Sequence, residues 1–240
     1  KKIKSFTLFV SRDAMNIDGL SEATLEKFLA EGFLHTYADL FHLDRHRDAI
    51  IQMDGFGEKS YQNLEASVEK ARHTNLARLI YSLGIPNIGI ANARMICREY
   101  KNDLDKMLAA PTEELAAMDG VGPVIAGAFV DFFAQGKNKT ALELLLKEVE
   151  LEQETFSEEA LPLSGQSFVI TGSLNHFENR SALKEKIEAL GGKVTGSVTG
   201  KTVCLINNDS TSNSAKNKKA RELGIVVLTE EEFMKQYLEK

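Results

Sequence analysis

The stretch Met53-Asp54-Gly55-Phe56-Gly57-Glu58-Lys59-Ser60 predicts a tight Gly-x-Gly turn that opens directly into a helix. Glycine accepts positive φ and lets another molecule approach the backbone closely. A helix that starts at such a turn points unpaired N–H groups outward, and these groups favour the binding of phosphate. The stretch therefore predicts a phosphate-binding turn at a helix start.

Three other stretches repeat this pattern. The four begin at residues 17, 53, 85 and 118, which are 36, 32 and 33 residues apart. Each has an apolar residue, then Gly or Asn two positions later, then another apolar residue and Gly or Ser. Apolar residues at helical spacing precede and follow each stretch. The repeat predicts four tandem helix–hairpin–helix units over residues 13–150.

The repeats differ in three informative positions. Ser21 replaces the second glycine of the first unit. Asn87 stands where the other units have their first glycine, and asparagine tolerates left-handed geometry better than most residues. Pro123 follows the last hairpin and suits the first turn of a helix, where a missing N–H costs nothing.

Backbone N–H groups at these turns would contact phosphates, which positions a protein on duplex DNA without reading its sequence. Lys59, just inside a helix start, would add a charge-assisted contact, or it is an ordinary solvated lysine. The alternative for the turns is that helical hairpins need glycine simply to turn, with the apolar residues in the core. The candidate DNA-binding residues are Gly19, Leu20, Ser21, Gly55, Phe56, Gly57, Lys59, Ile88, Gly89, Gly120, Val121 and Gly122.

The Gly-x-Gly at Gly55 also resembles the start of a dinucleotide-binding fingerprint. That fingerprint needs a preceding strand and a third glycine or alanine three residues on, where this chain has Ser60. No strand is predicted before the turn. NAD binding is therefore excluded at this position.

The pattern changes after residue 150. Residues 151–162 are acidic and lack periodicity, which indicates an exposed linker. Beyond it, strands are predicted at 167–170, 193–195, 203–206 and 225–228, alternating with helices at 181–190, 214–223 and 230–238. This alternation predicts a small α/β domain over 163–240 with a four-stranded parallel sheet. The chain is thus multidomain: a leading segment 1–12, an all-α domain, a linker and an α/β domain.

The amino-acid composition limits how this chain could bind phosphate, membranes or metal ions. The chain has 29 Lys and Arg against 35 Asp and Glu, and neither residues 1–150 nor 151–240 carry a basic excess. Phosphate binding must therefore rely on backbone dipoles and a few placed cations. No apolar run approaches the length needed to cross a membrane. Cys97 and Cys204 lie far apart, which excludes a Cys-x-x-Cys zinc site and favours a reducing cytoplasm. The five histidines do not cluster, so no catalytic or metal-binding residue is assigned.

Three parts of the chain resemble bacterial NAD-dependent DNA ligases. Residues Phe9–Leu20 resemble the segment that enters the helix–hairpin–helix domain of that family. Residues Tyr81–Gly89 are similar to its third hairpin, and Gly165–Ser173 with Ala189–Val194 resemble its BRCT domain. The resemblance covers almost all 240 residues and keeps the domain order.

The resemblance implies the C-terminal half of such a ligase. The chain has no Lys-x-Asp-Gly motif and none of the four zinc-site cysteines that precede the Phe-Val-Ser-Arg segment in the family. The whole enzyme would use NAD to adenylate itself, transfer AMP to the 5′-phosphate of a nick and seal it with the 3′-hydroxyl. It would also need Mg and a structural Zn, and the present chain alone would be inactive. The implied partners are nicked duplex DNA and the upstream adenylation, OB and zinc domains of a monomeric protein.

The α/β domain has its own candidate phosphate contacts. Thr171 and Gly172 at the end of the first predicted strand, and Lys216 near the start of the second helix, match positions that hold phosphate in phosphopeptide-binding BRCT domains. Thr-Gly also serves as a plain turn after a strand. Two residues depart from the family: Phe233 stands where many relatives have Trp, and Asn217 where ligases often have Leu.

Two other functions remain compatible with this sequence. Tandem hairpins also occur in DNA-repair scaffolds and nuclease subunits. A BRCT domain could instead make the chain a protein-interaction module that reads peptides.

Overall fold

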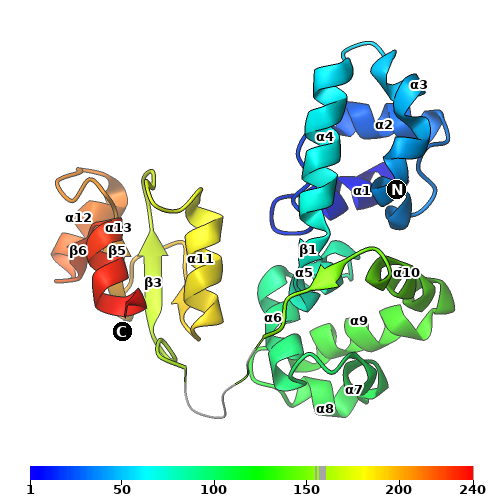
Figure 1. The fold of residues 1–240 in the computed structure, drawn as a ribbon. Helices are drawn as coiled ribbons and strands as arrows, with labels where there is room; N and C mark the ends of the chain where they lie inside the picture. The colour runs from blue at the N-terminus through cyan, green and yellow to red at the C-terminus, as the bar shows by residue number, and fades with distance from the viewer. Residues whose placement is uncertain (155, 157–160, 240) are drawn as a thin grey trace. The chain divides into compact units, whose positions relative to one another are not determined.

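The computed structural model describes residues 1–154, 156 and 161–239. The chain forms two compact units, Lys1–Phe156 and Ser157–Lys240 (Figure 1). Within the predicted linker over 151–162, residues 155 and 157–160 lie outside the described part of the chain.

The first unit is a helical assembly. Figure 1 shows α1 to α4 as one group of helices and α5 to α10 as another. The helices are α1 (Lys2–Val10), α2 (Glu22–Ala30), the 3-10 segment η1 (Tyr37–His46), α3 (Arg47–Ile51), α4 (Glu58–Ala71), α5 (Leu76–Ser82), α6 (Ile90–Glu99), α7 (Leu104–Ala109), α8 (Thr112–Ala116), α9 (Gly122–Ala134) and α10 (Gly136–Leu146).

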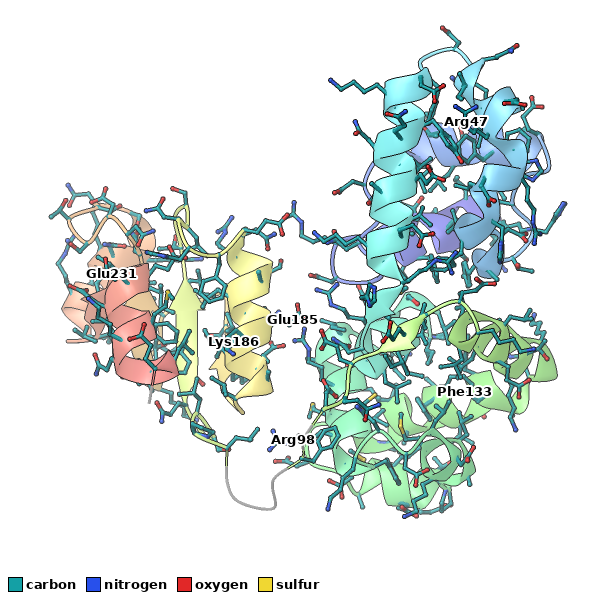
Figure 2. The ribbon with its side chains drawn as sticks, viewed as in Figure 1. Arg47, Arg98, Phe133, Glu185, Lys186 and Glu231 are labelled. Carbon is teal, nitrogen blue, oxygen red and sulfur yellow. The ribbon has the colours of Figure 1, made fainter. Side chains whose placement is uncertain are left out.

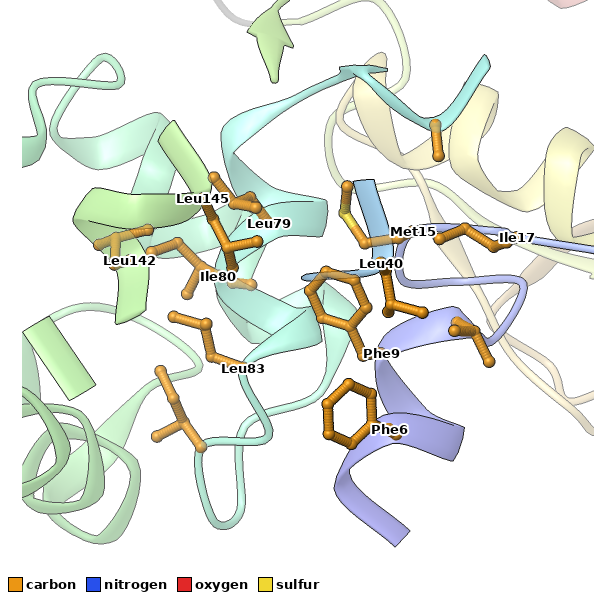
Figure 3. Packing of buried hydrophobic residues seen from close by; sticks show 14 of the residues in the cluster. Phe6, Phe9, Met15, Ile17, Leu40, Leu79, Ile80, Leu83, Leu142 and Leu145 are labelled. Atoms are coloured by element: carbon orange, nitrogen blue, oxygen red, sulfur yellow. The ribbon is translucent and has the colours of Figure 1, made fainter. Parts of the chain in front are cut away.

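All four predicted repeats share one hydrophobic core. Helix α4 buries Tyr61, Leu64, Val68 and Ala71, which fall on one face at three- and four-residue spacing. The leading segment joins the same core through α1, where the ring of Phe9 stacks on Tyr37 with centroids 4.5 Å apart. Figure 3 shows Phe9 of α1 and Leu142 of α10 in one cluster, on either side of Ile80 of α5. The repeats therefore fold as one body.

Two short strands in this unit were not predicted. β1 (His73–Thr74) pairs in parallel with β2 (Glu150–Leu151). Leu151, expected in the linker, thus belongs to a strand. A strand of two residues has no alternation to detect, so only the packing of the helices reveals it.

The second unit is a four-stranded, fully parallel sheet in the order β4-β3-β5-β6. This confirms the predicted fold class. The strands are β3 (Ser167–Ile170), β4 (Lys193–Val194), β5 (Thr202–Ile206) and β6 (Val226–Leu228), and the helices are α11 (Arg180–Ala189), α12 (Ala215–Glu222) and α13 (Glu230–Phe233), which continues into the π-helical turn η2 (Met234–Leu238).

Alternate residues of the strands face opposite sides of this sheet. Phe168 and Ile170 of β3 pack with Leu183 of α11 and Phe233 of α13. Val169, between them, packs on the other side with residues that include Ala220 of α12. Two helices therefore cover one face and α12 covers the other. Phe233 is fully buried with its ring edge-on to Phe168.

Candidate nucleic-acid interface

The backbone confirms the register of the four hairpins. Gly19, Gly55, Asn87 and Gly120, the equivalent positions of the repeats, all have positive φ, between 63° and 87°. In this left-handed region a residue with a side chain is strained, and asparagine tolerates it best after glycine. The four hairpins therefore share a left-handed residue at this position, and in the fourth the second glycine, Gly122, is left-handed as well, with φ of 71°.

The apolar residue of each turn faces inward. The side chains of Leu20, Ile88 and Val121 are buried in the core. Phe56 is half-buried, with its ring centroid 5.8 Å from that of Phe28. These four side chains, predicted as DNA-binding, hold the turns in place. The side chains of Leu20, Ile88 and Val121 are therefore closed to a ligand, whereas Phe56 keeps part of its ring exposed.

Three of these turns are closed by the same hydrogen bond. The N–H groups of Phe56, Ile88 and Val121 donate to the carbonyl oxygen three residues earlier, at 2.9, 3.2 and 3.2 Å. These N–H groups are therefore already used within the hairpins. The donors left for a ligand are those of the first turn of each following helix, which have no partner inside the helix.

The four helix starts differ in how their N–H groups are satisfied. In the first hairpin, the Ser21 hydroxyl accepts the N–H of Thr24 at 3.2 Å. In the third, Asn92 accepts the N–H of Gly89 at 3.1 Å. Gly57 begins α4 with no side-chain cap, and nothing lies within 4 Å of the place where its Cβ would be. Helix α9, after the fourth hairpin, also begins without a side-chain cap, and nothing lies within 4 Å of the Cβ position of Gly122. The second and fourth hairpins therefore leave their helix starts the most open.

Charged residues gather around the second hairpin from three helices. Lys59 is exposed on α4. The Nζ of Lys27, from α2, lies 3.3 Å from the carbonyl oxygen of Asp54. Arg47, at the start of α3 beside α4 (Figure 2), forms an ion pair with Glu58. Lys27 and Arg47 were not predicted at this site, because neither lies in the Met53–Ser60 stretch and no spacing links them to it.

The hairpins associate in two pairs. In the first pair, the N–H of Asp18 donates to the Ser67 hydroxyl on α4 at 2.8 Å, and a Cβ on Gly19 would contact Leu64 of the same helix. In the second pair, a Cβ on Gly120 would come within 2.3 Å of the Met95 methyl on α6. One turn of each pair therefore lies against the helix that begins at the other.

The predicted contacts in the second unit lie at the carboxyl ends of the strands. Thr171 follows β3, and its N–H donates to Ile206 of β5. A Cβ on Gly172, which has φ of 76°, would come within 2.7 Å of the Asn207 side chain. Asn207 donates to Asn217 of α12 at 2.8 Å. Lys216 precedes Asn217 in the first turn of that helix. The buried amide pair therefore connects the helix that carries Lys216 to the strand ends beside Thr171 and Gly172.

The two cysteine side chains are buried within the fold. Burial raises the pKa of the Cys97 thiol to about 12, and it does the same for Cys204. Among the described residues, no three His, Cys, Asp or Glu side chains gather closely enough to hold a metal ion. No helix in the described ranges has both the length and the apolar character needed to span a bilayer.

Comparison with known families agrees with this geometry. A model described as "Helix-hairpin-helix motif" matches residues 78–142, which hold the third and fourth hairpins. A model described as "BRCA1 C Terminus (BRCT) domain" matches residues 158–236. The chain is a helix–hairpin–helix and BRCT segment, homologous to one part of DNA ligases.

The relatives that establish this homology carry the name DNA ligase. The one from Lachnoclostridium phytofermentans is 57% identical over 98% of this chain and 36% of its own length. That from Ruminiclostridium cellulolyticum is 50% identical over the same shares. That from Brevibacillus brevis is 37% identical over 94% of the chain and 34% of its length. The chain spans about a third of the length of these curated relatives, and the resemblance to a C-terminal part of a DNA ligase is confirmed.

Proposed function

We propose that this chain binds duplex DNA without sequence preference, as the C-terminal part of a DNA ligase that seals nicks in replication and repair. The four left-handed turns, each leading into a helix start, are the observation that supports this proposal most directly. The net charge of −6 fits the same interpretation, because backbone N–H groups must then supply much of the attraction to phosphate. The matched motif, the BRCT domain and the ligase relatives all support DNA binding.

The longer protein would be a cytoplasmic, monomeric bacterial enzyme that consumes NAD. Its adenylation, OB and zinc domains would lie upstream and would hold NAD, Mg and a structural Zn. The residues of this chain do not fit NAD at the Gly55 turn, because helix α3 rather than a strand precedes it. The part of the chemistry left to this chain is to hold the duplex.

Serine substitutions at the second glycine of two hairpins test the DNA-binding surface. Gly57 and Gly89 have ordinary φ, and a Cβ at either position would make no closer contact than 3.7 Å. Serine occupies the equivalent position 21 naturally and is a favourable N-cap, so Gly57→Ser and Gly89→Ser should fold normally. Each should weaken binding to nicked duplex about tenfold by obstructing the approach of phosphate. Fluorescence anisotropy at a stated salt concentration measures the change.

Gly136→Ser is the matched control for these substitutions. Gly136 also begins a helix with open space around it, but it lies outside the hairpins. Its replacement should leave DNA affinity unchanged. Equal affinities for all three variants would contradict the role of the hairpins and would favour the alternative of a protein-interaction module.

The BRCT domain is proposed to add a phosphate contact through Thr171, Gly172 and Lys216. The amide pair that links these positions supports the proposal. Lys216→Ala should make the slope of log K against log salt less negative by about 0.9, because one phosphate fewer is neutralised. Lys235→Ala, on η2 of the same unit, should leave the slope unchanged. Identical slopes for both variants would leave the first unit as the whole DNA-binding surface.

A further inference from the structure

One side chain next to the fourth hairpin is unusually exposed for its chemistry. Val124 of α9 has a relative exposure of 68%, the largest among the exposed large hydrophobic residues of the described ranges. The others are Val226 at 51%, Leu223 at 41% and Leu144 at 38%. An isolated exposed valine is common on protein surfaces, so the position of Val124 in the repeat is what makes it informative.

Val124 occupies a defined position in the repeat. It lies two residues after the second glycine of its hairpin, and the equivalent residues of the other units are Ala23, Lys59 and Ala91. All four are exposed. The side chain at this position therefore points away from the core and stands beside the first-turn N–H groups of its helix. Whatever binds at a hairpin must pass close to it.

The surroundings of Val124 suit an uncharged contact. The first turns of α6 and α9, which follow the third and fourth hairpins, contain no acidic residue. Those of α2 and α4 contain Glu22 and Glu58. Asp119 is the only charged residue among 118–124. The second pair of hairpins thus presents a mostly neutral surface, whereas the first pair presents a charged one.

We propose that Val124 makes a direct apolar contact with the deoxyribose of the duplex bound by the fourth hairpin. The inference rests on the proposed function. The sugar rings present C–H groups between the phosphates, so a valine beside a phosphate-binding turn meets the apolar part of the same strand. Lys59, at the same repeat position in the second hairpin, meets the phosphate instead. One position of the repeat thus carries two kinds of contact, a charged one and an apolar one.

Salt dependence separates these contacts. An apolar contact releases no counterion, whereas a lysine on a phosphate releases about one. Val124→Ala should weaken binding of the full chain to nicked duplex about five- to tenfold at every salt concentration, with an unchanged slope of log K against log salt. Lys59→Ala should weaken binding mainly at low salt and make the slope less negative by about 0.9. Fluorescence anisotropy over a salt series measures both.

Leu144→Ala is the matched control, because Leu144 is an exposed apolar residue on α10, outside the hairpins. It should change neither affinity nor slope, and circular dichroism should show that all three variants remain folded. An affinity for Val124→Ala within twofold of that for Leu144→Ala would overturn the inference. If the unsubstituted chain failed to bind duplex at any salt concentration, the proposed function itself would be wrong. If only Val124→Ala had no effect, the inference alone would be wrong.

Discussion

Replacing Arg72 by methionine should destabilise the first unit by about 2 kcal/mol, because it removes one partner of a partly buried ion pair and leaves several hydrogen-bond acceptors without a donor. The guanidinium at the end of α4 donates to the carbonyl oxygen of Glu148 at 2.9 Å and to its carboxylate at 3.0 Å. It also donates to the carbonyl oxygen of Phe41 at 2.9 Å and lies over the ring of that residue. Methionine would fill part of the volume but leave these acceptors without a donor.

This arrangement ties the two hairpin pairs together. The residue that follows Arg72 begins β1, and the N–H of Glu150 in β2 donates to the Arg72 carbonyl at 2.7 Å. Loss of the side chain should therefore also weaken DNA binding, because the turns of the two pairs must be held together to contact one duplex. Urea unfolding followed by circular dichroism measures the loss of stability.

Arg47→Met is the control for this prediction. Arg47 forms an ion pair with Glu58, but both side chains are largely exposed, so the pair contributes little in water. The urea midpoint of this variant should stay close to that of the unsubstituted chain. Equal midpoints for the two arginine variants would show that the Arg72 cluster does not stabilise the unit.

Replacing Glu230 by glutamine should destabilise the second unit by about 3 kcal/mol, because hydrogen bonds to a buried charged group are strong and costly to disrupt. Glu230 is fully buried. Its carboxylate accepts the backbone N–H groups of Asn175, His176 and Phe177 at 2.7, 2.9 and 2.7 Å. A glutamine amide turns an NH₂ group toward at least one of these donors. The loop between β3 and α11 would then lose part of its anchor.

The same carboxylate makes the second unit sensitive to acid. Burial opposes the ionisation of Glu230, but its hydrogen bonds to Asn175, Phe177, Asn208 and His176 outweigh that cost and lower its pKa. A group with a depressed folded pKa contributes its full stability above the unfolded pKa, about 4.3 for Glu, and loses it as pH falls through the folded pKa.

The unsubstituted chain should therefore lose stability below about pH 4 through this group, whereas Glu230→Gln should lack this contribution. Thermal unfolding between pH 3 and 7 compares them. Glu231→Gln, at the exposed neighbouring position, should leave the melting temperature at pH 7 nearly unchanged. A Glu230→Gln variant that melts together with Glu231→Gln would contradict the anchoring role.

Local patterns predicted most of the elements. The hairpin at Gly55 could be located from the sequence because a left-handed turn restricts its residue to glycine or asparagine. Gly191 and Gly192 end the predicted helix over 181–190 with a glycine cap, since Gly191 has φ of 87° and the N–H of Gly192 donates to the carbonyl oxygen of Ile187. Thr229 caps α13 by accepting the N–H of Glu232. The predicted helix over 230–238 instead changes to a π-helical turn at Met234.

The candidate site was predicted less completely. Which glycines turn is a local property, but which turns have cations beside them is not. Lys27 approaches the second hairpin from another helix, 27 residues away from Asp54 in the sequence. The inward orientation of Leu20, Ile88 and Val121 also depends on packing, because an apolar residue at the tip of a turn is compatible with either a core contact or a ligand contact.

The sequence by itself determined the repeat, the turns, the helix starts and the β/α alternation of the second unit, because backbone preferences and apolar spacing act within a few residues. The tertiary structure alone decided which hairpins form pairs, where β1 meets β2, and that Arg72 meets Glu148, 76 residues later. Those contacts join segments that are distant along the chain. They are specified by the shape and charge of packed surfaces, and no local pattern encodes them.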